Sequence, residues 1–138
     1  MELTVKQRAI LNGARCPYCG SETKAVSEEF IYGRKYRGRT MICCSRYPSC
    51  DSYCGTHDDG TSLGRLANKQ LRFWKKEAHS AFDPIWKEKY KERTEAYEWL
   101  ADELELPDSY THIGYFGIKT CKKVIDICNK FMNEQRNR

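Results

Sequence analysis

The sequence predicts an α+β protein, in which a cysteine-rich first part with two short strands precedes a helical second part. Six of the eight cysteines lie between positions 16 and 54, in a region that also carries turn-forming glycines and prolines. Residues 61–138 instead place apolar side chains about 3.6 positions apart, which is the period of an amphipathic helix. We therefore expect one part over residues 1–60 and another over 61–138, packed together as one compact unit.

The first part is expected to contain a short helix and a β-hairpin. Residues 2–12 are compatible with the helix, and residues 24–32 and 36–44 with the two strands. Gly33 and Gly38 bracket the turn that would join these strands.

Three to four helices are expected in the second part. Residues 63–82 show the first periodic stretch, and Asp83 followed by Pro84 is typical of a cap and first position of a new helix. Thr94 is the expected cap of a further helix, and Pro107 ends that region. The last helix carries an apolar stripe at core spacing, so its two cysteines are expected to pack rather than to bind metal: Ile118, Cys121, Ile125, Cys128 and Met132.

Charge and cysteine content narrow the class of protein. The formal net charge is +5, and residues 1–50 carry 9 basic and 4 acidic side chains, so the excess lies in the first part. No apolar run approaches the roughly 20 residues of a membrane helix, and the first residues lack a signal-peptide pattern. We expect a cytoplasmic protein without a membrane partner, whose clustered cysteines bind metal rather than form disulfides.

Cysteine spacing predicts a zinc site made of two short knuckles. Cys16 and Cys19 form the first, with a C-x2-C spacing that can wrap one zinc ion. The second ends at Cys50 and begins at Cys43 or Cys44. Strand alternation puts adjacent residues on opposite faces, and we choose Cys44, which leaves Cys43 to pack on the other face.

Other uses of these cysteines stay open. Cys54 or His57 could replace one of the four ligands, because their spacing after Cys50 is also workable. The thiols could instead be buried and free. A redox role for Cys16 and Cys19 lacks the βαβ context that such motifs have.

The two knuckles resemble the four-cysteine zinc ribbons of bacterial topoisomerase I tails. Those tails read C-P-x-C, a hairpin, and then C-x-x-Y-P-x-C, and this chain has CPYC followed by CSRYPSC. The resemblance covers about residues 16–50. It implies one structural zinc bound by Cys16, Cys19, Cys44 and Cys50.

A longer resemblance covers about residues 16–128. The stretches CPYC, YPSCDSYCGTH, LGRLANKQLR, AHSAFDPIW, RTEAYEWLADEL and HIGYFGIKTCKKVI occur in this order. Together they resemble an uncharacterised zinc-finger-containing family of phages and bacterial mobile elements. Cys54 departs from that family, in which an aliphatic residue is expected. The resemblance implies a zinc ribbon joined to a helical part, and it implies no activity.

Nucleic-acid binding is the function that the residues favour. The stretch FIYGRKYRGRTMICCSRY, residues 30–47, carries five cations and no acid, interleaved with aromatic side chains. Cations contact phosphates and aromatic rings stack on unpaired bases, and the topoisomerase ribbons suggest single-stranded DNA. The alternative is a solvated hairpin whose tyrosines only cover the zinc. The expected contact residues are Arg34, Lys35, Tyr36, Arg37, Arg39, Arg46 and Tyr47.

Two further functions are kept as alternatives. A protein-interaction module could bind or inhibit a host enzyme by strand addition or through exposed aromatic residues. A metal-dependent nuclease could use a second site drawn from His57, His79, Asp83 and His112. No nuclease signature or phosphate-binding loop occurs in the sequence, and Pro84 is expected to break the helix near Asp83. We therefore expect a protein that is not an enzyme, in which His79 and Asp83 cap and brace the junction between the ribbon and the helices.

Overall fold

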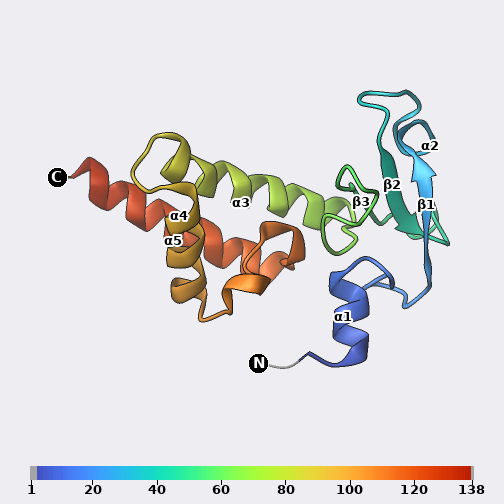
Figure 1. Ribbon diagram of the computed structural model, residues 1–138, viewed down its shortest axis with the longest axis horizontal. Coiled ribbons are helices and arrows are strands. Elements are labelled where there is room, and N and C mark those ends of the chain that lie inside the picture. Colours follow the sequence, from blue (N-terminus) through green and yellow to red (C-terminus); the bar gives the residue numbers. More distant parts are fainter. Residues whose placement is uncertain (1–2, 138) are drawn as a thin grey trace. The chain divides into compact units, whose positions relative to one another are not determined.

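The computed structural model describes residues 3–137, and the chain divides into unit 1, residues 1–69, and unit 2, residues 70–138. Figure 1 shows short strands and two short helices in unit 1, and longer helices in unit 2. The predicted α+β class is confirmed. Unit 1 contains α1 (Val5–Leu11), β1 (Thr23–Ser27), α2 (Glu28–Tyr32), β2 (Thr40–Cys44) and β3 (Tyr53–Cys54). From the unit boundary onward the elements are α3 (Lys69–Lys87), α4 (Arg93–Leu104), η1 (Asp108–Tyr110), η2 (Ile113–Tyr115) and α5 (Ile118–Arg136).

The strands of unit 1 form an antiparallel sheet in the order β1-β2-β3. Cys43 pairs with Tyr53, and Ile42 pairs with Cys54. Directly opposed residues share a face of a sheet, and neighbours along a strand lie on opposite faces. One face, here called the cysteine face, therefore carries Ile42, Cys44 and Cys54. The other, here called the aromatic face, carries Cys43 and Tyr53.

The prediction of a strand over residues 24–32 is wrong for the second half of this range. The chain leaves the sheet after Ser27 and forms the one-and-a-half-turn helix α2. Ser27 caps this helix, because its Oγ accepts a hydrogen bond from the backbone N–H of Phe30 at 3.2 Å. Gly33 ends it in the left-handed conformation, with φ of 80°. The aromatic residues of this stretch therefore lie on a helix.

The second predicted strand, residues 36–44, begins only at Thr40. A carboxylate holds the preceding residues in a loop instead. Glu28 Oε2 accepts hydrogen bonds from the backbone N–H groups of Tyr36, Arg37 and Gly38, at 2.9, 3.0 and 3.1 Å. These donors are therefore not available to pair with β1. We call this arrangement the Glu28 clamp.

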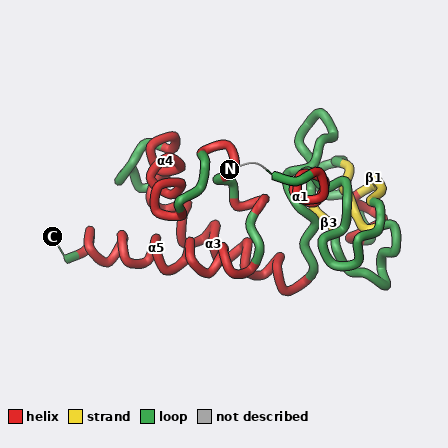
Figure 2. Tube along the Cα trace, turned by 90° about the horizontal axis from the view of Figure 1, so that it is seen from below, coloured by secondary structure: helices red, strands yellow, loops and turns green. Residues whose placement is uncertain are grey.

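Unit 2 is built on α3 and α5, which run side by side in Figures 1 and 2. Of the apolar stripe predicted for the last helix, Cys121, Cys128 and Met132 are buried in α5, whereas Ile118 and Ile125 are only half-buried. The core prediction for Cys121 and Cys128 is thus confirmed. The fully buried side chains of the unit include Leu71, Phe82, Ile85, Leu100, Ile113 and Val124.

Pro84 does not start a new helix, contrary to the prediction, but lies inside α3. Proline lacks the N–H that would bond to the carbonyl four residues earlier, which costs roughly 3 kcal/mol in a helix interior. Phe82 and Ile85, on either side, are both fully buried. Their burial in the core stabilises the helical path through the proline.

Two other helix starts differ from the predictions. Leu66 and Ala67 precede α3 and belong to unit 1, where Ala67 exchanges two backbone hydrogen bonds with Tyr53 at 3.0 and 3.1 Å. Thr94 lies in the first turn of α4, whose cap is Glu92.

The short N-terminal helix is α1, within the predicted residues 2–12, of which residue 2 lies outside the described range. Across residues 3–137, no helix is both long enough and apolar enough to span a bilayer.

Candidate metal centre

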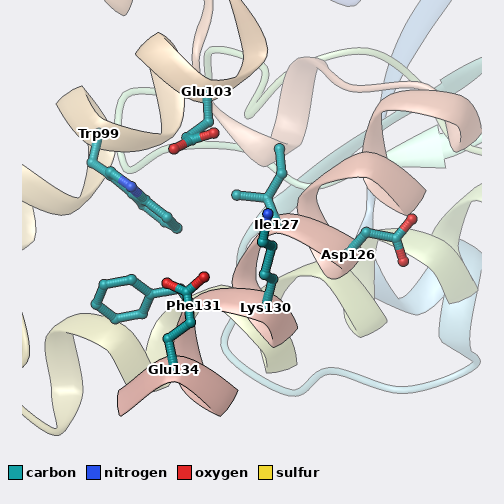
Figure 3. Close-up of a pocket in the computed structure, with 7 residues that line it drawn as sticks. All are labelled: Trp99, Glu103, Asp126, Ile127, Lys130, Phe131 and Glu134. Atoms are coloured by element: carbon teal, nitrogen blue, oxygen red, sulfur yellow. The ribbon is translucent and has the colours of Figure 1, made fainter. Parts of the chain in front are cut away.

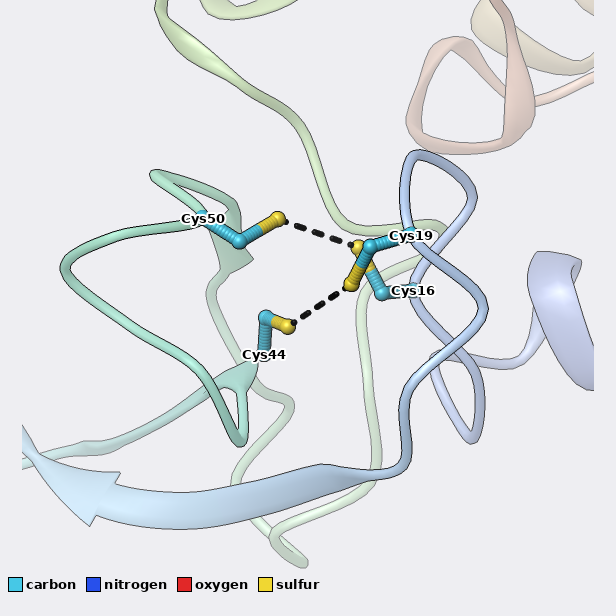
Figure 4. A group of neighbouring side chains, drawn as sticks. All are labelled: Cys16, Cys19, Cys44 and Cys50. Carbon is cyan, nitrogen blue, oxygen red and sulfur yellow. Dashed lines mark hydrogen bonds between the residues drawn. The ribbon is translucent and has the colours of Figure 1, made fainter.

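Four cysteine sulfurs converge in unit 1, as Figure 4 shows. They belong to Cys16, Cys19, Cys44 and Cys50, and all four lie within 4.8 Å of one another. Cys16 Sγ is 3.6 Å from Cys50 Sγ, and Cys19 Sγ is 3.4 Å from Cys44 Sγ. The structure therefore brings together the four cysteines that the spacing selected.

Each knuckle turns its backbone toward a sulfur. The N–H of Tyr18 points at Cys16 Sγ and the N–H of Arg46 at Cys44 Sγ, both at 3.4 Å. Gly20 allows the first turn, because it adopts a φ of 76° that residues with a Cβ rarely adopt. Such N–H groups stabilise negative charge on the sulfur they face. Both knuckles thus use a backbone N–H group to stabilise a cysteine sulfur.

These sulfurs fit a tetrahedral zinc ion. With Zn–S bonds of about 2.3 Å, the edges of the tetrahedron are roughly 3.8 Å long, close to the shorter sulfur separations here. Four thiolates without a water position are typical of a structural zinc site rather than a catalytic one. When bound, the ion would link residues of β2 to two turns.

The pKa of Cys19 is shifted in the opposite direction to the pKa of Cys44 and of Cys50. Hydrogen bonding to Ser21, whose Oγ is 3.3 Å from Cys19 Sγ, lowers the pKa of Cys19 to about 6. Burial raises the pKa of Cys50 to about 12, and burial also raises the pKa of Cys44. Because zinc binds thiolates, Cys44 and Cys50 must release their protons against this effect of burial when the metal binds.

The rival ligands lie outside the cluster. Cys43 is fully buried on the aromatic face, away from Cys44, as strand alternation requires. Cys54 packs against the cluster but lies 3.3 Å from Ser62 Oγ. His57 lies in a turn, where its backbone N–H donates to Thr61. Within residues 3–137, the four cysteines form the one group of three or more potential ligands.

Two neighbours of the cluster were not predicted. Ser52 is fully buried, and its Oγ lies 3.3 Å from Cys16 Sγ and 3.7 Å from Cys50 Sγ. Leu66 is also fully buried against Cys16 and Cys44. A hydroxyl and an aliphatic side chain so placed orient the sulfurs and exclude water. The sequence offered a weak signal for Ser52, its position two residues after a ligand, and none for Leu66.

Comparison with known proteins assigns the chain to a family. The family DUF3268, described as a zinc-finger-containing domain, matches residues 12–131. The chain belongs to this family. No curated protein and no solved structure matches it. The family and the four clustered cysteines together give this zinc-finger-containing domain a single structural zinc.

Beyond the zinc site, the zinc-finger-containing domain has a continuous row of five aromatic rings. Neighbouring ring centroids are 5.7, 6.1, 6.0 and 5.5 Å apart. The row links α2, the second knuckle, β3 and the 34–39 loop. Its members, called the aromatic row below, are in order Phe30, Tyr47, Tyr53, Tyr32 and Tyr36.

The predicted cations lie on the same loop and knuckle as members of this row. Arg34 lies over the ring of Tyr36 at 4.7 Å, and Lys35 and Arg37 are exposed on the same loop. Arg46 is exposed in the second knuckle, beside Tyr47. Among the residues the structure describes, none of these four cations forms an ion pair. Arg39 differs, because its guanidinium pairs with Asp58 at 2.9 Å.

The residues of the alternative second site do not converge. His79 and Asp83 share a face of α3, with Nδ1 and Oδ1 3.7 Å apart, so Pro84 does not separate them as predicted. His112 instead contacts Tyr97 and Tyr115 through its ring, at 5.8 and 5.6 Å between centroids. Within residues 3–137, no third ligand joins the His79 and Asp83 pair.

Proposed function

We propose that this zinc-finger-containing domain binds single-stranded nucleic acid, with a preference for DNA, and does so without catalysis. The observation that carries the proposal is the aromatic row on unit 1 together with four exposed cations on its loop and knuckle that form no ion pair among the described residues: Arg34, Lys35, Arg37 and Arg46. Zinc then has a structural role. It holds the second knuckle, and with it Arg46 and Tyr47, against β2.

The aromatic row supports the proposal because three of its rings are open to solvent. Phe30, Tyr32 and Tyr36 are 49%, 45% and 58% exposed. Large aromatic side chains are usually more buried than this, since their exposure costs hydrophobic free energy. Stacking on an unpaired base contributes roughly 1–3 kcal/mol for each ring. A strand with exposed bases would cover these rings.

The cations support the same ligand. Arg34, Lys35 and Arg37 lie on one short loop, and the Glu28 clamp holds the backbone of that loop. Each phosphate contact releases counterions and makes affinity depend on salt. Arg39 contributes less in this proposal, because Asp58 already neutralises it.

The resemblance to topoisomerase I ribbons favours DNA over RNA and stays a prediction. The phage or mobile-element setting, the cytoplasmic location and the host-protein partner are also predictions. A host protein could dock on the same aromatic row, and the experiment below distinguishes it from a nucleic acid.

The test is a titration of the zinc-loaded protein with fluorescein-labelled oligothymidine, and with a DNA duplex, at several salt concentrations. We expect the single strand to bind more tightly. We also expect Arg34→Gln, Lys35→Gln and Arg37→Gln together to weaken binding and to flatten the salt slope by roughly 0.7 for each lost phosphate contact.

The matched control removes three cations from unit 2. Lys76, Lys119 and Lys123 are exposed, and their replacement by Gln changes the net charge by the same amount. Equal weakening in both triple variants would show that only net charge matters. Absence of binding at low salt would overturn the proposal and leave the aromatic row as a protein-docking surface.

A further inference from the structure

The structure assigns a second interaction surface to unit 2, a groove between α4 and α5 that takes the arginine side chains of an extended basic segment of a protein partner. This inference does not depend on the proposed nucleic-acid binding, because different residues of the other unit carry it. Figure 3 shows the groove and the side chains that line it.

Two helices supply the walls of the groove. Trp99 and Glu103 come from α4, and Phe131 and Glu134 come from α5, with Ile127 in the floor. Glu103 follows Trp99 by four residues on α4, and Glu134 follows Phe131 by three on α5, spacings that place both members of each pair on the same helix face. Each aromatic ring thus shares a helix face with a carboxylate that also lines the groove.

The charged side chains that line the groove favour a basic ligand over an acidic one. Its lining includes three carboxylates, of Glu103, Asp126 and Glu134, and one ammonium group, of Lys130. None of the three carboxylates forms an ion pair within the described part of the chain. Residues 92–105 make the α4 wall acidic, since they contain six acids and one arginine, and this excess is larger than the opposite one of α5, where residues 118–136 contain five basic and two acidic side chains. A phosphate would be repelled here, whereas a basic side chain would be attracted.

The rings of the groove already attract a cation from this chain. Trp99 and Phe131 are in tilted contact, with centroids 5.1 Å apart. Lys91, which does not line the groove, places its Nζ 5.6 Å from the Trp99 ring and 5.4 Å from the Phe131 ring. Both rings are only half-buried. Their remaining exposed surface can accept a second cation by the same interaction.

Size and chemistry favour arginine in an extended segment. The groove encloses about 320 Å³, near the lower end of the range for ligand sites, and this suits one or two side chains rather than a helix. A guanidinium can stack on an aromatic ring and donate two hydrogen bonds to one carboxylate, which an ammonium cannot do. The neighbouring ring and carboxylate pairs match both requirements.

The experiment measures binding of a fluorescein-labelled hexapeptide with two arginines to the full, zinc-loaded chain by fluorescence anisotropy. The same peptide with citrulline in place of arginine keeps the side-chain shape without its charge. We expect the arginine peptide to bind and the citrulline peptide not to. We expect Glu103→Gln with Glu134→Gln to weaken binding about tenfold, with unchanged thermal unfolding.

The matched control is Glu95→Gln with Glu98→Gln, which removes two exposed carboxylates from the same helix α4 outside the groove. We expect less than about a twofold change for this pair. Equal losses in both pairs, or equal binding of the citrulline peptide, would overturn the inference. A concentration-dependent dimer of the free protein that Glu103→Gln with Glu134→Gln dissolves would also overturn it, because a second copy would then fill the groove.

Discussion

Unit 1 and unit 2 differ in what their interiors contain. Among the described residues of unit 1, Leu66 is the one large aliphatic side chain that is fully buried, and its neighbours in the interior are cysteines. Unit 2 fully buries a phenylalanine and several aliphatic residues from three helices. Fewer than 70 residues with so small an apolar core are marginally stable unless a metal or disulfides cross-link them.

The difference shows what zinc does in this protein. In unit 1 the ion substitutes for the hydrophobic core, because it ties two turns and a strand to one point. Hydrogen bonds such as the Glu28 clamp then order the loops around it. In unit 2 the packing of α3, α4 and α5 performs the same task without a metal. The two units should therefore respond differently to the same kind of perturbation.

The largest expected effect comes from Cys44→Ser. Loss of one ligand should abolish tight zinc binding, which contributes roughly 10–16 kcal/mol in small zinc modules, and should unfold unit 1. Unit 2 should keep its helices. Metal analysis would report the lost zinc, and amide spectra would report which residues remain folded.

The control for this prediction is Cys43→Ala, which alters the adjacent residue on the aromatic face. It should keep one zinc ion per chain and lose about 1 kcal/mol of stability through the smaller side chain. If Cys43→Ala lost the metal and Cys44→Ser kept it, the assignment of the two faces of β2 would be wrong. Loss of the α3 and α5 signals in Cys44→Ser would show that the units fold together.

A smaller loss of stability is expected from Phe82→Ala, and it should affect unit 2 instead of unit 1. Phe82 is fully buried and packs on Tyr97, with ring centroids 4.8 Å apart. Its removal leaves a cavity that should cost about 3–5 kcal/mol and destabilise unit 2. Zinc binding should stay intact, as measured by metal content and by spectra of cobalt-substituted protein. Release of the metal in this variant would contradict the comparison between the units.

The smallest effect is expected from Glu28→Gln, which weakens the clamp without touching the zinc. Backbone N–H groups, first that of Arg37 and then that of Tyr36, lower the pKa of Glu28 below its ordinary value. Unfolded glutamate has a pKa of about 4.3, so the charged clamp is complete above this pH and is lost as pH falls through the lower folded pKa. At neutral pH the Glu28 carboxylate is charged and the clamp is complete, so we expect Glu28→Gln to weaken it there.

Hydrogen exchange at the amides of Tyr36, Arg37 and Gly38 measures this effect. Exchange should be faster in Glu28→Gln at neutral pH, while the amides of β2 keep their protection. Glu29→Gln is the control, because Glu29 is exposed and accepts none of these three hydrogen bonds. Unchanged exchange at Tyr36, Arg37 and Gly38 would show that the clamp does not order the loop.

Several features were predictable because they depend on neighbours in sequence. The spacing of Cys16 and Cys19 sets a knuckle within four residues, and strand alternation separates Cys43 from Cys44 at any position in a fold. The stripe of α5 follows from helical periodicity alone. In each case the relevant contacts are decided within a few residues of chain.

The wrong predictions concern residues whose partners are distant or whose local signals compete. Aromatic and β-branched residues after Ser27 favour a strand, but a capping hydroxyl and Gly33 make them a helix. Tyr53 and Cys54 form a strand only because β2 lies beside them, and two residues carry no periodic signal. Glu28 holds donors eight to ten residues further along the chain, a distance at which no sequence pattern marks the contact.

By itself, the sequence determined the class of the protein, its cysteine set and the apolar stripe of its last helix, since these follow from local geometry and period. Only the tertiary structure decided three other features: the path of α3 through Pro84, the burial of Ser52 and Leu66 beside the sulfurs, and the joining of five rings into the aromatic row. The physical reason is that burial and contact between distant segments depend on how elements pack, and their free energy can exceed a local preference of a few kcal/mol.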